Sequence, residues 1–179
     1  MQKAIVISAF PGTGKSYLTK HCEEIPDLRG ITFQDSDSSN YSWIKKDGKK
    51  VRNPDFPANY IQHIKDSMYK SRIIFVSSHT AVRSALKQEG ISFVSVYPDT
   101  DCKAEYLERY KKRGSPQSFI QNMDEMWDAF MTEARDPANM GDFRKTLEGG
   151  QYIDAPMIID LICQIGALRA AAAICGETL

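Results

Sequence analysis

The stretch SAFPGTGKSYLTK, residues 8–20, continues directly from the apolar run KAIVIS, residues 3–8. A short run rich in Ile and Val is typical of a strand that is buried on both faces. Two glycines then punctuate the chain, and residues 14–24 have the pattern of a helix. The sequence therefore predicts a buried strand, a glycine-rich turn and a helix in direct succession.

Strands and helices alternate along the rest of the chain, which favours a parallel sheet with helices on both faces. We therefore expect an α/β fold, a single three-layer α/β/α domain over residues 1–179 with a five-stranded, mostly parallel sheet. Met123, Met126, Trp127 and Phe130 recur at helical spacing and are expected in its core. Further strands are predicted at 30–34, 72–78, 91–99 and 151–154. Helices are predicted at 59–69, 81–90, 102–114, 115–135 (with Ser115 as N-cap) and from about 155 to 175. Residues 44–54 are predicted to form a loop.

The composition is that of an ordinary soluble protein, with 42% hydrophobic and 26% charged residues. Its 23 basic residues balance 23 acidic ones, so no global field attracts it to nucleic acid or to anionic lipid. Four separated cysteines without a CxxC pair indicate reduced, mostly buried thiols, no structural zinc and a cytoplasmic protein. No apolar run is expected to reach the length that a membrane span needs.

The residues AFPGTGKS, 9–16, match the phosphate-binding pattern GxxxxGK[ST] except that Ala9 replaces the first glycine. In this pattern glycines let successive backbone N–H groups curl around phosphate oxygens, and the helix N-terminus adds positive potential. Lys15 is expected to reach the terminal phosphates, and the Ser16 hydroxyl to ligate Mg²⁺. A methyl group at Ala9 is tolerated if its φ is negative. The predicted nucleotide-binding residues are Pro11, Gly12, Thr13, Gly14, Lys15, Ser16 and Tyr17.

The PGTGKS core resembles the P-loop kinases, in particular the branch of adenylate kinase, shikimate kinase and gluconate kinase. The resemblance implies the P-loop NTPase fold with a helical lid, and ATP and Mg²⁺ as the bound species. Residues 33–41, FQDSDSSNY, resemble the end of the second strand of shikimate kinase. By that resemblance Asp35 faces the metal, and Asp37 faces and deprotonates the acceptor hydroxyl. The alternative is an Asp/Ser-rich turn whose side chains cap their own backbone.

The predicted third strand ends in Ser77, Ser78 and His79, without the carboxylate that hydrolytic P-loop ATPases carry there. This favours a kinase over a motor-type ATPase. His79 is interpreted as a helix-entry residue, with phosphate binding as the alternative. Arg83, one turn further along, is a candidate for binding a phosphate of the substrate.

By the same resemblance, residues of about 105–120 form the lid. Arg109 and Arg113 lie four residues apart, so they share a helix face and are candidate catalytic cations. Pairing of Arg109 with Glu105 at i, i+4 is the alternative.

The acceptor is expected to bind at an insertion of about 38–60, where aromatic residues alternate with a basic run. Trp43 is the preferred substrate contact, whereas Phe56 and Tyr60 are at least as well explained as core. The leading function is transfer of the γ-phosphate of ATP to a small acceptor, a nucleoside or nucleotide above all. The alternatives are a polynucleotide or modified-base kinase, in which 44–52 contacts a nucleic-acid backbone, and a regulatory NTPase without an acceptor. No membrane partner is expected.

Overall fold

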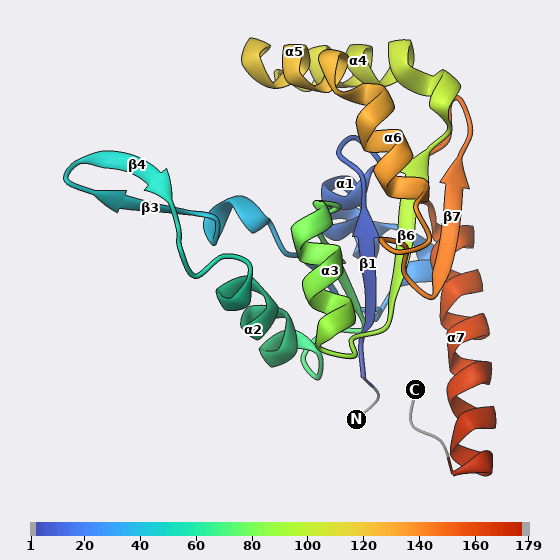
Figure 1. Cartoon of the computed structure of the whole chain (residues 1–179). Helices are drawn as coiled ribbons and strands as arrows, with labels where there is room; N and C mark the ends of the chain where they lie inside the picture. Colours follow the sequence, from blue (N-terminus) through green and yellow to red (C-terminus); the bar gives the residue numbers. More distant parts are fainter. Residues whose placement is uncertain (1–2, 177–179) are drawn as a thin grey trace.

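The fold is a three-layer α/β/α sandwich, seen in a computed structural model that describes residues 3–176 (Figure 1). Its central sheet has five parallel strands in the order β2-β5-β1-β6-β7. This confirms the predicted fold class. The strands are β1 (Ile5–Ala9), β2 (Phe33–Asp35), β5 (Ile73–Val76), β6 (Phe93–Pro98) and β7 (Phe143–Leu147).

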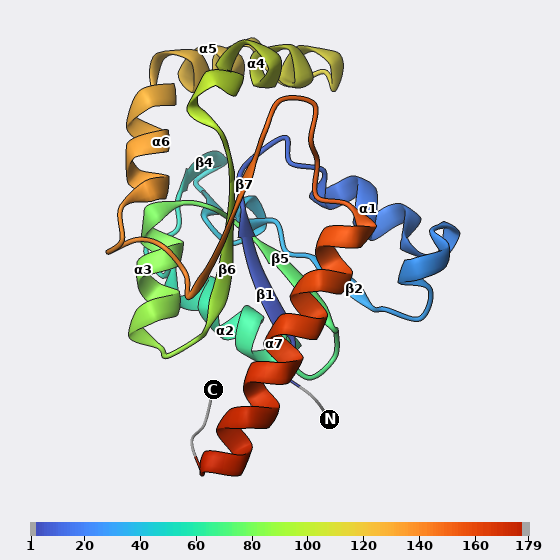
Figure 2. The ribbon, with the colours of Figure 1, turned by 90° about the vertical axis from the view of Figure 1, so that its right-hand side faces the viewer.

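Helices cover both faces of this sheet because its central strands are apolar on both sides. In β1, Ile5 and Ile7 face a core shared with α1 (Lys15–His21) and α7 (Ala155–Cys175). The alternate residue Val6 faces α2 (Ala58–Ser67) and α3 (Thr80–Gln88). Figure 2 shows α7 lying along one face, with α2 and α3 on the other.

Three more helices follow β6: α4 (Lys103–Lys112) and α5 (Gln117–Glu125) lie across the carboxyl ends of the strands, and α6 (Trp127–Arg135) runs back beside β6 (Figure 1). They enclose an aromatic core in which the ring of Phe10, just after β1, packs edge-on against Trp127 at 5.7 Å between centroids. These three helices connect β6 to β7 and cover the carboxyl end of β1 (Figure 1).

The prediction of one helix over 115–135 was wrong, because the chain bends at Met126 between α5 and α6. The bend buries Trp127, whose indole N–H donates to the Thr100 carbonyl at 2.9 Å, and leaves Met126 42% exposed. Met126 is therefore not a core residue. Pro116, rather than Ser115, is the N-cap of α5.

The loop predicted at 44–54 is in fact a β-hairpin of β3 (Trp43–Lys46) and β4 (Lys49–Arg52). Asp47 and Gly48 connect the two strands with φ values of 51° and 74°. An Asp-Gly pair with positive φ at both positions is a favoured two-residue hairpin turn, because its twist matches that of the strands. This dipeptide was the signal that could have identified the hairpin.

The last strand was also misplaced: β7 spans 143–147, whereas residues 151–154 are irregular. Residues 151–154 instead run past the glycine-rich turn, where the Ile153 N–H donates to the Thr13 carbonyl at 2.9 Å. β7 lies at the edge of the sheet and carries Arg144 and Lys145, so it lacks the apolar run by which the inner strands were recognised.

Two composition-based expectations need correction. Only Cys22 and Cys102 are buried, whereas Cys163 and Cys175 are exposed, although all four thiols are free. The α7 helix, with 21 residues and a mean hydropathy of 1.8 over its most apolar window, is long and apolar enough to span a membrane. It packs Ile158, Leu161 and Ile165 into the core, and 22% of its most apolar window is buried in the structure.

Candidate phosphate-transfer site

One cavity of about 1480 Å³ opens at the carboxyl ends of the parallel strands. After β1 the chain continues to β2, at one edge of the sheet, whereas after β6 it continues to β7, at the opposite edge. Ligands of open α/β sheets bind at such a reversal of strand order. All of the residues predicted from the sequence line this cavity: Pro11, Gly12, Thr13, Gly14, Lys15, Ser16, Tyr17, Asp35, Asp37, Trp43, Arg83, Arg109 and Arg113.

The glycine-rich turn needs glycine for both conformational and steric reasons. Gly12 and Gly14 have φ values of 83° and 101°, which side-chain-bearing residues rarely adopt. A Cβ on Gly12 would also lie 3.0 Å from the Tyr110 ring. The buried Thr13 hydroxyl donates to the Phe10 carbonyl at 2.8 Å and closes the turn on itself.

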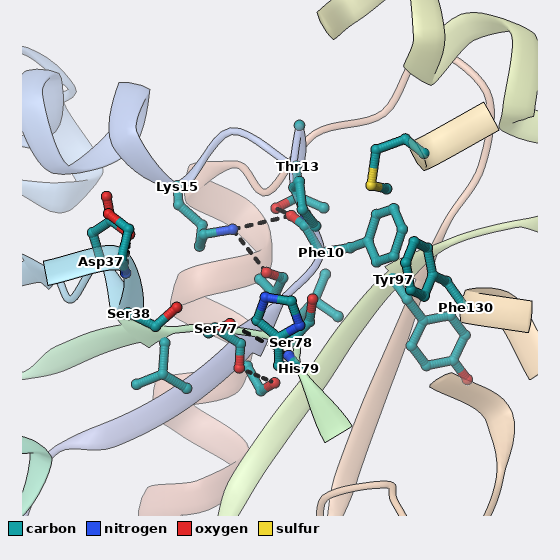
Figure 3. Close-up of a pocket in the computed structure, with 18 of the residues that line it drawn as sticks. Phe10, Thr13, Lys15, Asp37, Ser38, Ser77, Ser78, His79, Tyr97 and Phe130 are labelled. Carbon is teal, nitrogen blue, oxygen red and sulfur yellow. Dashed lines mark hydrogen bonds between the residues drawn. The ribbon is translucent and has the colours of Figure 1, made fainter. Parts of the chain in front are cut away.

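Lys15 begins α1 and extends back along the turn. Its Nζ donates to the carbonyls of Ala9 at 2.7 Å and Phe10 at 3.0 Å, as Figure 3 shows. Burial lowers the pKa of this ammonium to about 8, although the carboxylates of Asp35 and Asp37 favour its charged form. The ammonium is therefore still mostly protonated at pH 7 and is held within the cavity by neutral oxygens.

The Ser16 hydroxyl donates to Oδ2 of Asp35 at 2.5 Å. A hydroxyl and a carboxylate side by side are oxygen ligands of the kind that Mg²⁺ takes, and this ion commonly uses one or two protein oxygens together with phosphates. No cluster of three or more His, Cys, Asp or Glu side chains able to hold a metal alone occurs within residues 3–176. The pair thus fits a magnesium ion that is shared with a phosphorylated ligand.

Asp37 lies just beyond β2 and caps the short 3₁₀ turn Ser38–Asn40, where its Oδ1 accepts from the Ser39 N–H at 2.8 Å. This is the backbone-capping role considered as the alternative. The carboxylate nevertheless lines the cavity and acts on the charge of Lys15. Capping leaves its Oδ2 without a hydrogen-bond partner in the described part of the chain, so both roles are compatible.

The two arginines of the segment predicted as a lid differ in their surroundings. Arg109 is buried and pairs with Glu105, while its Nη1 donates to the Gly12 carbonyl at 3.0 Å and its Nη2 to the Gln151 carbonyl at 2.8 Å. It ties α4 to the glycine-rich turn. Arg113 is exposed, lies over the rings of Tyr110 and Phe119, and its charge helps to lower the pKa of Lys15.

Arg83 lies in the opposite wall, 4% exposed, where its Nη2 donates to Thr80 Oγ1 at 3.3 Å and to the Glu133 carbonyl at 3.4 Å. Its Nε has no hydrogen-bond partner within residues 3–176. His79 precedes α3 as its N-cap residue without a side-chain cap. Burial, followed by the charges of Arg52 and Arg83, lowers the pKa of His79. This end of the cavity therefore carries the positive charges of Arg52 and Arg83, with the Glu133 carboxylate beside them, which accepts from the Thr80 hydroxyl at 2.6 Å.

Figure 3 shows the two sides of the cavity around Lys15. Asp37 and Ser38 lie on one side, and the rings of Phe10, Tyr97 and Phe130 lie on the other. Phe10 and Tyr97 are each 5% exposed, so the aromatic side is the surface of a packed core, whereas the polar side offers charged groups to a phosphorylated ligand.

Sequence reasoning missed the role of Tyr60, which it treated as a substrate contact or core residue. Tyr60 is fully buried, and its hydroxyl donates to the Ser36 carbonyl at 2.6 Å and accepts from the Ser77 N–H at 3.2 Å. Burial raises the pKa of this phenol to about 12. Tyr60 thereby ties the segment between Asp35 and Asp37 to the end of β5.

Replacing Tyr60 by phenylalanine should lower the free energy of unfolding by about 1–3 kcal/mol, because the Ser36 carbonyl and Ser77 N–H lose their buried partner. Urea denaturation measures this loss. Tyr69→Phe, at a tyrosine that is 58% exposed, is the matched control and should change stability by less than about 0.5 kcal/mol. Equal effects of the two changes would show that the Tyr60 hydroxyl does not support this segment.

The comparisons with known proteins leave the family open. Neither the protein-family models nor the curated proteins include a match to this chain. Among solved structures, the chain is similar to an uncharacterized protein from Eubacterium ventriosum ATCC 27560, with 16% identity, a TM-score of 0.42, and coverage of 92% of this chain and 98% of that one.

Proposed function

We propose that the protein is an ATP-dependent phosphotransferase that moves the γ-phosphate of ATP to a hydroxyl or phosphate of a nucleoside or nucleotide acceptor. The observation that carries the proposal is the convergence of the Lys15 ammonium, the Ser16–Asp35 pair and the Asp37 carboxylate in one cavity. These are the cation, metal-binding oxygens and base that phosphoryl transfer uses.

In this proposal the backbone of residues 11–16 and the Lys15 ammonium hold the phosphates of ATP. Ser16 and Asp35 would hold Mg²⁺, which supplies positive charge to the phosphate oxygens. Asp37 accepts the proton of the acceptor hydroxyl through its uncapped oxygen. The acceptor oxygen then forms a bond to the γ-phosphorus as the bond to the ADP oxygen breaks.

Two further features support the assignment of roles. Arg113, the more exposed lid arginine, is suited to neutralise charge on the transferred group, whereas Arg109 positions the turn through the Gly12 carbonyl. At the opposite end of the cavity Arg52 and Arg83 outnumber the single Glu133 carboxylate, and they would interact with a phosphorylated acceptor. We place the activity in the cytoplasm, where ATP is abundant and free thiols persist.

The proposal is tested by incubating the protein with ATP, Mg²⁺ and a mixture of nucleosides, nucleotides and short oligonucleotides, and then identifying new phosphorylated products by mass spectrometry. A product that requires both ATP and acceptor supports a kinase. If phosphate is released slowly and independently of every acceptor, the protein is instead a regulatory NTPase.

A further inference from the structure

The β3–β4 hairpin extends away from the body of the molecule (Figure 1). Its strands pair only with each other, in a separate two-stranded sheet. Isolated hairpins are marginally stable, so an arm of this kind is well placed to serve binding rather than core formation.

The hairpin carries uncompensated positive charge. Lys45 lies directly opposite Lys50, and Lys46 directly opposite Lys49. Like charges in opposed cross-strand positions destabilise a hairpin. No ion pair joins any of these lysines to an acidic group in the part of the chain that the structure describes, and Asp47 is the only acidic residue between 43 and 52. A bound polyanion would offset this repulsion.

The two faces of the hairpin differ in chemistry, because side chains alternate along each strand. What we term the aromatic face carries Trp43, Lys45, Lys50 and Arg52. There the Trp43 indole is 40% exposed, with Lys50 Nζ 5.2 Å and the Arg52 guanidinium carbon 5.1 Å from the ring centroid. The opposite face carries Ile44, Lys46, Lys49 and Val51.

The aromatic face leads into the proposed site of phosphate transfer. Trp43 and Arg52 line the same cavity as the glycine-rich turn and Asp37. Arg52 also lies over the Phe56 ring, 5.1 Å from its centroid, and so connects the hairpin to the cavity wall. A ligand that follows this face therefore reaches the acceptor end of the cavity.

We propose that the aromatic face binds the backbone of a single-stranded nucleic acid whose terminal nucleotide is the acceptor of the phosphate. This rests on the proposed phosphate transfer from ATP and replaces the free nucleoside or nucleotide acceptor by the terminal nucleotide of a strand. A base stacks on Trp43, while Lys45, Lys50 and Arg52 contact successive phosphates, which is the combination that proteins use for single strands. The hairpin tip is Asp47-Gly48 and carries no apolar side chain to insert, which argues against a membrane surface.

The test is binding without ATP. Fluorescence anisotropy of a labelled single-stranded DNA 12-mer and of its RNA counterpart is measured between 50 and 200 mM NaCl. Each phosphate contact contributes about 0.7 to the slope of log affinity against log salt. Lys45→Gln/Lys50→Gln should therefore reduce the magnitude of this slope by about 1.4. Trp43→Ala should weaken binding about tenfold at every salt concentration without changing the slope.

The matched control is Lys46→Gln/Lys49→Gln, which removes the same charge from the opposite face and should change the slope by less than half as much. Equal slopes for the two double variants would overturn the proposal, as would the absence of oligonucleotide binding at 50 mM NaCl. Binding only to vesicles that contain an anionic lipid would assign the hairpin to a membrane surface instead. If the wild-type protein binds the strand through the aromatic face but transfers no phosphate to it from ATP, the binding surface stands and the proposed function is contradicted.

Discussion

Replacing Lys15 by alanine is expected to lower the rate of phosphate transfer by about a thousandfold. The Lys15 ammonium is the cation that the glycine-rich turn holds within the cavity, through the carbonyls of Ala9 and Phe10. Its charge acts in a partly desolvated site, where removal of one group that stabilises transition-state charge typically costs two to three orders of magnitude. The measurement is the initial rate of product formation at saturating acceptor and ATP.

The matched control is Lys20→Ala, at an exposed lysine further along α1, which should keep the wild-type rate. Lys15→Met keeps most of the length of the side chain and should be as inactive as alanine, which separates loss of charge from loss of packing. Thermal unfolding shows whether each variant is folded. A folded Lys15→Ala protein with more than a tenth of the wild-type rate would contradict the role assigned to this lysine.

The inner part of the fold was predictable because its strands carry local signals. The runs that contain β1, β5 and β6 are apolar and buried on both faces, and each is followed by a helix that buries its own apolar face. The turn at Gly12 and Gly14 was predictable for a related reason, since its φ values restrict which residues can occupy it. In these segments local chemistry and tertiary structure agree.

The edges of the fold were predicted poorly because their strands are half exposed. β7 contains the charged residues Arg144 and Lys145. The hairpin strands β3 and β4 are rich in lysine, and most of their residues are exposed. Neither element therefore has the apolar run of an inner strand. The break at Met126 depends on the tertiary contact of Trp127 with the Thr100 carbonyl. No window of sequence around Met126 contains that partner.

The candidate site likewise contains some residues that the sequence could identify and others that it could not. The residues proposed to bind phosphate follow from a motif with fixed spacing, so each of them could be named from the sequence. Those that position the motif are distant in sequence: Arg109 reaches the Gly12 carbonyl from α4, and Tyr60 reaches Ser36 and Ser77 from α2. The i, i+4 pairing of Arg109 with Glu105 was visible in the sequence, but the additional bonds to the Gly12 and Gln151 carbonyls were not.

The second large effect on the rate of phosphate transfer is expected at Asp37, because its proposed role lies in the chemical step and not in the binding of ATP. Asp37→Asn is expected to lower the rate of transfer to a hydroxyl acceptor by about a hundredfold or more, since a positioned base contributes 10²–10⁴. An asparagine oxygen can still accept the hydrogen bond from the Ser39 N–H, and asparagine is as good a cap as aspartate. The fold and ATP affinity should therefore change little, as isothermal titration and thermal unfolding would measure.

A comparison of three variants distinguishes the role of Asp37 as a base from its role as a cap of the 3₁₀ turn. Asp37→Ala removes both, so it should lose transfer to the same extent as asparagine and in addition lose about 1 kcal/mol of stability. Asp35→Asn alters the partner of the Ser16 hydroxyl and should raise the Mg²⁺ concentration needed for half-maximal rate, whereas Asp37→Asn should not. If Asp37→Asn transfers phosphate at the wild-type rate while Asp37→Ala is merely less stable, the carboxylate is only a cap, and the proton of the acceptor leaves by another route.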